Sequence, residues 1–176
     1  MTTLGFKKLT LDNWLQPDEA STAFESISPI DGKTHPTTAN ERLGYILRPQ
    51  LAEKVPTEVS ALFEVARGAM AYGYFFYPLY ALGCEQLFRV VETSVNLKCK
   101  AMGGPSKVHK FYEKLEWLVL MKVISEEEKN IWHALRELRN LASHPQNQTI
   151  LTPGVVIGIV ERIADKINFL FESTSE

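Results

Sequence analysis

The residues best suited to chemistry lie near the end of a strongly helical stretch, in the run Arg-Glu-Leu-Arg-Asn-Leu-Ala-Ser-His-Pro at positions 136–145. Its polar members of interest are Arg136, Arg139, Asn140 and His144. An arginine guanidinium can hold a phosphate through two parallel hydrogen bonds, and histidine transfers protons near neutral pH. Together, these residue types supply what cleavage of RNA without a metal ion requires.

The spacing within this run depends on where the helix ends. In an unbroken helix, five residues would turn His144 about 140° away from Arg139, too far for the two to share one ligand easily. Pro145 disfavours helical backbone at the preceding residue, so the helix ends at or before His144. The chain can then bring the imidazole back toward the arginine.

The helix that leads into the run is predicted to begin at Ser125. Ser125 and Glu128 form a capping box, in which each side chain bonds the other residue's backbone N–H. One apolar face is expected to carry Ile131, Leu135, Leu138 and Ala142. With that face as the origin, Arg139 lies about 80° round, Trp132 about 100° and Arg136 about 140°. Arg139 is therefore expected at the edge of the buried face, beside an aromatic ring and a second cation.

A purely structural interpretation of the run stays open. Cations in the last turn of a helix interact favourably with its macrodipole, and His144 near the helix end does the same. Arg136 or Arg139 could also pair with Glu128 or Glu137 on the helix surface.

Helical periodicity dominates the rest of the chain from residue 56 to residue 176. Pro56 opens one helix, a second starts near Pro78, and the sequence Gly103-Gly104-Pro105 separates the second from a third. The three helices are expected to bury the following side chains: Val59, Leu62, Phe63, Ala66, Ala69 and Met70; Tyr80, Cys84, Leu87, Val91 and Val95; and Val108, Phe111, Leu115 and Leu118. Thr152-Pro153 starts a last helix, with an apolar stripe of Val156, Val160, Ile163, Ile167 and Leu170.

Residues 1–55 differ from this body, because they combine four prolines with scattered apolar residues. They predict an irregular arm with short helical turns at 18–25 and 38–48. Little in the sequence predicts a strand. The expected fold is therefore all-α, an antiparallel bundle of four to five helices formed by residues 56–176, with the arm laid over it.

Bulk composition limits the possible partners. The 176 residues are 45% apolar and carry a formal charge of −2, which argues against a broadly basic nucleic-acid surface. A lysine cluster could contact RNA locally, although a solvated helix face is the more common meaning of such a pattern. Its members are Lys98, Lys100, Lys107, Lys110, Lys114 and Lys122. The aromatic stretch from Tyr72 to Tyr80 could stack on bases, but core packing at a helix joint is favoured.

The cysteines and the N-terminal sequence predict the compartment. Cys84 and Cys99 have no metal-ligand spacing, so two free thiols in a reducing cytoplasm are expected. The sequence shows neither a signal peptide nor an apolar run long enough to span a membrane. We therefore expect a cytoplasmic protein that does not associate with a membrane.

Arg139-Asn140-Leu-Ala-Ser-His144 resembles the RNxxxH form of the Rx4-6H motif of the HEPN superfamily of small all-helical proteins. The resemblance extends over roughly residues 70–172. The stretch Tyr80-Ala-Leu-Gly-Cys-Glu85-Gln-Leu is similar to the long family helix that carries an acidic position. Residues 109–118 and 125–128 are similar to the part of such domains that leads into the motif helix. Residues 1–55 are not covered.

The resemblance implies a homodimer in which two motifs face each other and form one composite site. Many HEPN proteins are metal-independent endoribonucleases of toxin–antitoxin, phage-defence and RNA-processing systems. His144 would then transfer the proton when a 2′-hydroxyl attacks the adjacent phosphate, and Arg139 would stabilise charge on that phosphate. Asn140 would orient the loop or a ligand, Arg136 would support the site, and Glu85 could position Arg139 or His144.

Several partner and cofactor expectations follow from the resemblance. RNA is the expected substrate, an antitoxin or defence protein is a possible partner, and neither DNA nor a cofactor is expected. In HEPN toxins paired with nucleotidyltransferase antitoxins, a modifiable tyrosine often follows two residues after the histidine. This chain has Gln146 at that position, which excludes such regulation there.

Two alternatives to the nuclease are considered. The first is a non-catalytic HEPN-type module that binds a protein, a nucleotide or RNA, which the near-neutral charge and the N-terminal arm favour. The second is a metal hydrolase, which is disfavoured because the four histidines show no HxH or HxxxH spacing and no acidic residues cluster with them.

Overall fold

The computed structural model describes residues 7–105, 107–133 and 151–172, and most of these residues are helical. The strands among them form one two-stranded sheet. The mainly helical fold predicted from the sequence is thus confirmed. The elements are α1 (Glu19–Thr22), β1 (Glu25–Ile27), β2 (Thr34–Pro36), α2 (Ala39–Leu47), α3 (Thr57–Tyr72), α4 (Leu79–Ala101), α5 (Phe111–Leu120) and α7 (Pro153–Glu172). Residues 126–133 are also helical.

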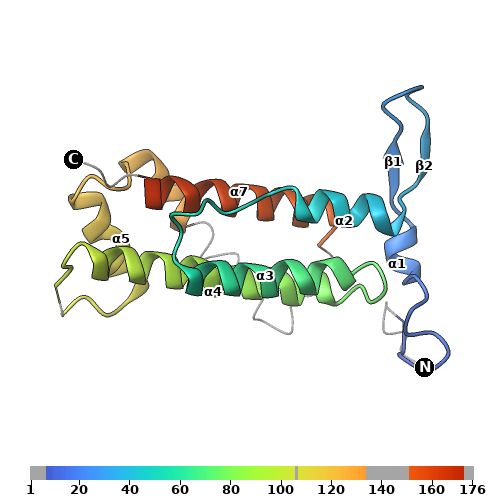
Figure 1. The fold of residues 1–176 in the computed structure, drawn as a ribbon, viewed down its shortest axis with the longest axis horizontal. Coiled ribbons are helices and arrows are strands. Elements are labelled where there is room, and N and C mark those ends of the chain that lie inside the picture. Colours follow the sequence, from blue (N-terminus) through green and yellow to red (C-terminus); the bar gives the residue numbers. More distant parts are fainter. Residues whose placement is uncertain (1–6, 106, 134–150, 173–176) are drawn as a thin grey trace.

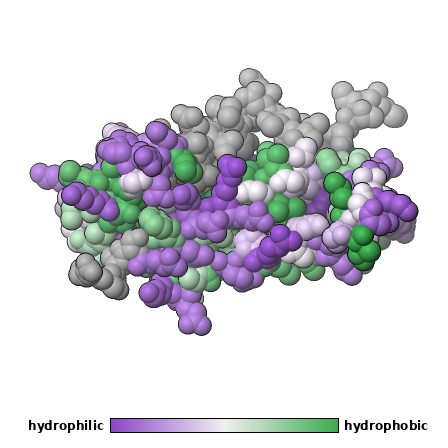
Figure 2. Space-filling model, turned by 90° about the horizontal axis from the view of Figure 1, so that it is seen from above, coloured by the Kyte–Doolittle hydropathy of each residue, from purple (hydrophilic) through white to green (hydrophobic). Residues whose placement is uncertain are grey.

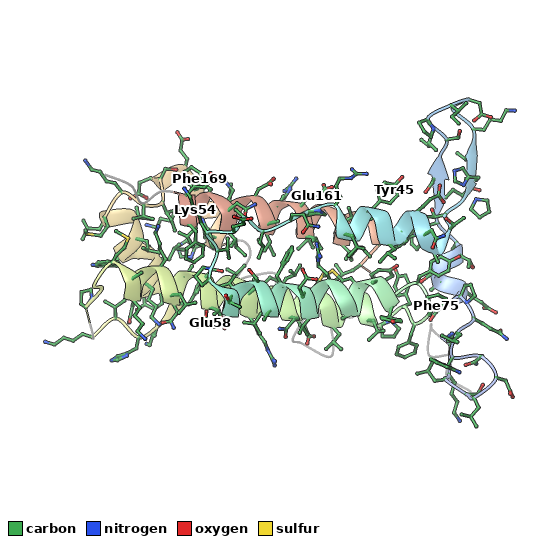
Figure 3. The ribbon with its side chains drawn as sticks, in the orientation of Figure 1. Tyr45, Lys54, Glu58, Phe75, Glu161 and Phe169 are labelled. Atoms are coloured by element: carbon green, nitrogen blue, oxygen red, sulfur yellow. The ribbon has the colours of Figure 1, made fainter. Side chains whose placement is uncertain are left out.

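The described helices form an elongated body (Figure 1). α3 and α4 lie along one side, and α7 lies along the other, with α2 near one of its ends. α4 packs against α3, α7 and α5, while α2 contacts both α3 and α7. Apolar side chains fill the space between the two rows of helices (Figure 3). Helix α4 is thus the central element of the core.

The helical periodicity correctly identified the buried faces of α4 and α7. The predicted stripe of α4 is buried, while Glu85 and Arg89 are exposed on its flank. All five predicted residues of the α7 stripe are likewise fully buried. No helix in the described ranges is both long enough and apolar enough to cross a membrane.

Close backbone approach joins α3 to α4. A Cβ atom added to Gly83 would lie 2.4 Å from Met70 Cγ and 3.1 Å from the Ala66 carbonyl oxygen. At the turn between the helices, a Cβ atom on Gly73 would lie 2.7 Å from the ring of Tyr80. Tyr80 is completely buried, as the core-packing interpretation of the aromatic stretch predicted, whereas Tyr72 is 62% exposed.

The N-terminal arm contains the two predicted helical turns, which are α1 and α2. The hairpin of β1 and β2 was not predicted. Its strands pair in antiparallel register, with Glu25 opposite Pro36 and Ile27 opposite Thr34. Each strand has only three residues, and Ile27 is 69% exposed. The hairpin therefore lacks the alternation of buried and exposed residues that identifies a strand in a sequence.

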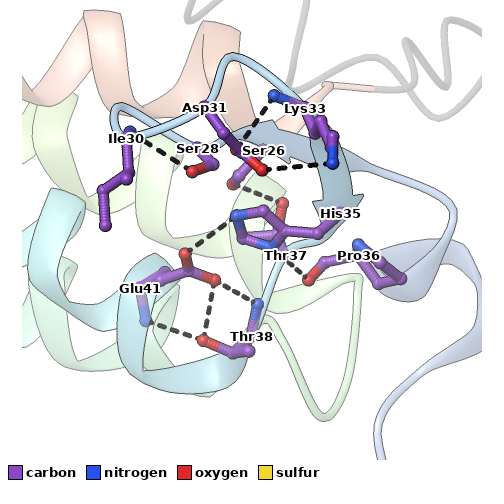
Figure 4. A network of polar contacts seen from close by, with 10 residues as sticks. All are labelled: Ser26, Ser28, Ile30, Asp31, Lys33, His35, Pro36, Thr37, Thr38 and Glu41. Carbon is purple, nitrogen blue, oxygen red and sulfur yellow. Dashed lines mark hydrogen bonds and ion pairs between the residues drawn. The ribbon is translucent and has the colours of Figure 1, made fainter.

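Polar contacts at the base of the hairpin hold the start of α2 (Figure 4). The Thr38 hydroxyl accepts from the Glu41 backbone N–H at 3.2 Å, and Glu41 Oε2 accepts from the Thr38 backbone N–H at 2.8 Å. His35 Nε2 lies 3.5 Å from Glu41 Oε1. The Thr38 backbone N–H, more than the neighbouring His35, holds the pKa of Glu41 below its usual value.

The arm is fastened to the turn between α3 and α4. Asp18 is fully buried; its Oδ1 accepts from the Ala20 N–H at 3.1 Å, and its Oδ2 accepts from the Tyr77 N–H at 3.0 Å. The Ser21 hydroxyl donates to the Gly73 carbonyl at 2.9 Å. Asp18 therefore caps α1 and the turn at the same time.

The domain boundary after residue 55 stays a prediction.

Two details of the predicted helices were wrong. The third helix starts at Phe111 rather than before Val108, because Glu113 Oε2 accepts from the His109 and Lys110 backbone N–H groups and fixes the start there. In the next helix, Ile131 is 41% exposed and Trp132 only 2%. The buried face at this point is therefore centred near Trp132.

Ion pairs explain the orientation of residues 126–133. Ser125 caps the segment, accepting from the Glu128 N–H at 3.2 Å, which confirms this half of the predicted capping box. Glu128 pairs with Lys166 of α7, and Lys129 Nζ lies 2.7 Å from Glu116 Oε2 of α5. The segment therefore lies between α7 and α5, which turns Trp132 inward.

Candidate functional site

The predicted site residues Arg136, Arg139, Asn140 and His144 lie outside the described residues, as does Gln146. Their geometry relative to one another therefore stays a prediction.

Glu85, the remaining predicted site residue, lies on α4, where it is exposed on the flank of the buried stripe. Its carboxylate is therefore accessible from outside the core.

The residues on either side of the run 134–150 make contacts that the structure describes. Before it, Trp132 is buried and His133 Nε2 lies 3.7 Å from Glu116 Oε1. After it, the carbonyl of Leu151 accepts a 2.8 Å hydrogen bond from the Tyr77 hydroxyl. Tyr77 belongs to the turn that precedes α4. The motif-bearing segment thus connects a position beside α5 to a position beside the start of α4.

Tyr77 is held in place by ring contacts as well as by its hydroxyl. Its ring stacks on Phe24 of the arm at 6.4 Å and meets the ring of Tyr80 edge-on at 5.4 Å. Burial raises the pKa of the Tyr77 hydroxyl, with a smaller contribution from Tyr80. Because the phenol stays protonated at neutral pH, it acts as a hydrogen-bond donor to Leu151.

A second candidate site is a cavity of about 230 Å³ where α4 ends and α5 begins. Its polar and aromatic lining comes from both helices and the loop between them: Asn96, Lys100, His109, Lys114 and Trp117. The periodicity of the sequence did not identify this cavity. The lysine cluster was the available signal, because Lys100 and Lys114 belong to it and line the cavity.

The lysines of the predicted cluster differ in their surroundings. Lys98 is only 2% exposed, and its Nζ lies 5.8 Å from the centre of the Phe171 ring. Burial lowers the pKa of Lys98. Lys100 and Lys114, in contrast, line the cavity. Lys98 therefore belongs to the packing between α4 and α7 and is not part of a cationic surface.

The thiols and the acidic groups suggest no further site. Burial raises the pKa of Cys84 to about 12 and that of Cys99 to about 11, so both thiols are protonated at neutral pH. Both cysteines are free. Across residues 7–105, 107–133 and 151–172, no group of three His, Cys, Asp or Glu side chains could hold a metal ion.

These observations define a mainly helical protein in which α4 organises the core and the segment between residue 133 and α7 carries the predicted site. The family model of a domain of unknown function, DUF4145, matches residues 71–172, from the end of α3 to the end of α7. Since this match covers more than half of the chain, the protein belongs to the DUF4145 family. No curated protein and no solved structure matches it.

Proposed function

We propose that this protein is a metal-independent endoribonuclease of the HEPN type, active as a homodimer. The observation that carries the proposal is the run Arg139-Asn140-Leu-Ala-Ser-His144, which lies between the helix that follows Ser125 and the start of α7. The burial of Trp132 and the hydrogen bond to Leu151 support the proposal, because the residues that flank the segment with this run are held by the helical body.

The proposed architecture is an antiparallel bundle of four to five helices. α3, α4, α5, α7 and the helix that contains residues 126–133 would form it, and two copies would meet so that their motifs line one cleft. Glu85 supports this arrangement because it is exposed on α4 and could position a cation of the motif.

The proposed reaction needs no metal. A 2′-hydroxyl of RNA attacks the adjacent phosphorus, the bond to the 5′-oxygen breaks, and a 2′,3′-cyclic phosphate and a 5′-hydroxyl end form. His144 takes part in the transfer of the hydroxyl proton, and the 5′-oxygen gains a proton as it leaves. Arg139 stabilises the charge that develops on the phosphate oxygens. Toxin, phage-defence and RNA-processing roles would all fit this chemistry.

The test is cleavage of labelled RNA by purified protein in a chelating buffer, with detection of cyclic phosphate ends. Arg139→Ala and His144→Ala are each expected to reduce the cleavage rate at least 100-fold, on the order of the contribution of one charge-stabilising donor and of one general acid or base, respectively. Arg48→Ala and His35→Ala are matched controls outside the motif and should cleave normally. Unimpaired cleavage by the motif variants, or a protein that is monomeric while active, would overturn the proposal.

A second candidate is a non-catalytic binding module that docks a partner protein. It is favoured by apolar side chains that the N-terminal arm exposes: Leu9, Leu11, Trp14, Leu15, Ile27 and Ile30. Hydrophobic residues stand among hydrophilic ones at the right-hand end of the surface in Figure 2, the end that carries the hairpin in Figure 1. No cleavage at high protein concentration, together with retained RNA or partner binding, would favour this candidate.

A further inference from the structure

We propose that the cavity between the end of α4 and α5 binds one nucleotide unit of single-stranded RNA. The Trp117 ring would stack on the base, and Lys100 and Lys114 would contact the phosphate. The choice of RNA as the ligand rests on the proposed ribonuclease function. The site itself does not depend on cleavage at the Arg139–His144 motif.

The charge around the cavity favours an anion. Besides the buried Lys98, residues 96–117 contain four lysines and two glutamates, although the whole chain carries a net charge of −2. Both glutamates are already engaged. Glu113 accepts from the backbone N–H groups of His109 and Lys110, and Glu116 pairs with Lys129. The positive charge of the exposed lysines is therefore only partly compensated.

Lys114 is oriented by a neutral partner. Its Nζ donates to Asn96 Oδ1 at 2.5 Å, which fixes the ammonium group between α5 and α4. No ion pair found in the described ranges includes Lys114 or Lys100. An ammonium group has three donors. Lys114 can therefore contact a phosphate while it keeps its bond to Asn96.

The C-terminal end of α4 does not oppose an anion as strongly as an open helix end would. The carbonyls at such an end carry partial negative charge. Here the Cys99 carbonyl accepts from the Gly104 N–H at 2.8 Å, and the Lys100 carbonyl accepts from the Gly103 N–H at 3.1 Å. Gly103 has a φ of +72°, and a Cβ atom on Gly104 would lie 2.9 Å from the Cys99 carbonyl oxygen. These two glycines allow the loop to cover the helix end.

The size and composition of the cavity fit one unit of a nucleic-acid strand that is only partly enclosed. The volume of about 230 Å³ lies below the range of roughly 300–1,000 Å³ that is usual for pockets enclosing a complete small molecule. An aromatic side chain beside a cationic groove is the arrangement that holds successive bases and phosphates of single strands. The Asn96 amide adds a group that can also bond a base edge.

The test measures binding separately from cleavage. The anisotropy of a labelled eight-nucleotide RNA is followed with His144→Ala protein in a chelating buffer. Trp117→Leu is expected to weaken binding by roughly 5- to 150-fold, the range for loss of one base–aromatic stack. Trp117→Phe keeps an aromatic ring and should retain most of the affinity. Phe169→Leu changes a 46% exposed aromatic side chain outside the cavity and is the matched control.

The lysines are tested through the salt dependence of the same binding. Lys100→Gln with Lys114→Gln should reduce the slope of log K against log salt by about 0.7 for each lost phosphate contact. Lys33→Gln, at the tip of the hairpin, removes one charge away from the cavity and should leave the slope unchanged. Circular dichroism of each variant establishes that the helices have formed.

The outcomes separate this proposal from the proposed function. Cavity variants that bind RNA as tightly as their controls overturn the site, even if the wild-type protein cleaves RNA. Weakened RNA binding in a protein that never cleaves supports the site and contradicts the nuclease. AMP serves as a competitor: if it binds as tightly as the RNA and responds equally to Trp117→Leu, the ligand is a free nucleotide and the RNA assignment fails.

Discussion

The hydroxyl of Tyr77 donates a hydrogen bond to the carbonyl of Leu151 over 2.8 Å. This bond joins the turn before α4 to the residue that follows the motif-bearing segment and precedes α7. The backbone N–H of Tyr77 also binds the buried carboxylate of Asp18, and its ring stacks on Phe24. One tyrosine therefore links the arm, the start of α4 and the entry to α7.

Tyr77→Phe tests this link. The change keeps the ring contacts but removes the donor to Leu151, so we expect unfolding to become easier by about 0.5–1.5 kcal/mol. Urea denaturation measures the effect. Tyr72→Phe is the matched control, because Tyr72 is 62% exposed and its replacement should change stability little. If Tyr77→Phe matched this control, the bond to Leu151 would contribute nothing measurable.

The packing of α3 against α4 predicts opposite effects for two glycines. Gly83→Ala places a methyl group 2.4 Å from Met70 Cγ and should destabilise the protein by about 1–3 kcal/mol through overpacking. Gly68 is exposed inside α3, where nothing lies within 4 Å of an added Cβ atom. Gly68→Ala should therefore stabilise the protein by about 0.5–1 kcal/mol, because alanine favours the helix.

Thermal unfolding of both glycine variants measures the two stability changes relative to the wild type. A destabilised Gly68→Ala protein would contradict the open space seen beside α3. A stable Gly83→Ala protein would show that Met70 can move aside without cost.

Sequence periodicity predicted α4 and α7 well because each is long and buries one continuous stripe. The same reasoning failed at Ile131. There, ion pairs to Lys166 and Glu116 on neighbouring helices decide which face turns inward, and a single helix does not reveal such partners. The hairpin was missed because its three-residue strands bury no side chain, and its polar contacts depend on α2.

The cavity at the end of α4 could be predicted only in part. The lysines marked the region, but burial of Lys98 and the approach of Asn96 to Lys114 depend on how α4 and α5 pack. The motif itself was found from residue types and spacing. Whether Arg139 and His144 act together stays a prediction for the cleavage experiment.

Buried ionisable groups predict a loss of stability at alkaline pH. The Cys84 thiol has a pKa of about 12 in the folded protein, against 9.0 for an ordinary thiol. Between these values the thiolate forms only in the unfolded chain, so stability is fully present below pH 9 and falls as pH rises toward 12. Burial likewise raises the pKa of the Tyr80 hydroxyl above its usual value of 10.0, so this group also favours the unfolded chain at alkaline pH.

Cys84→Ala isolates the contribution of this thiol. The variant should be less stable at every pH because it loses packing, but its stability should fall less steeply between pH 8.5 and 10.5. The difference in that fall should reach about 2 kcal/mol, since one pKa unit corresponds to about 1.4 kcal/mol. Urea denaturation at the two pH values measures it. Equal falls in the variant and the wild type would contradict a raised thiol pKa.

The pairing of Glu128 with Lys166 predicts that the helix leading into the motif is held partly by an ion pair. The side chains of Lys166 and Glu128 are only 24% and 19% exposed, so solvent screens them less than a surface pair.

A double-mutant cycle of Glu128→Gln and Lys166→Met should give a coupling energy of about 1 kcal/mol or more. The pair of Arg48 and Glu161, 4.0 Å apart and 65% and 43% exposed, is the control. Its coupling should stay below about 0.5 kcal/mol. If residues 126–133 also position the motif, Glu128→Gln should slow RNA cleavage, whereas Glu161→Gln should leave the rate unchanged. Equal coupling energies for the two pairs would mean that the contact with α7 does not position this helix.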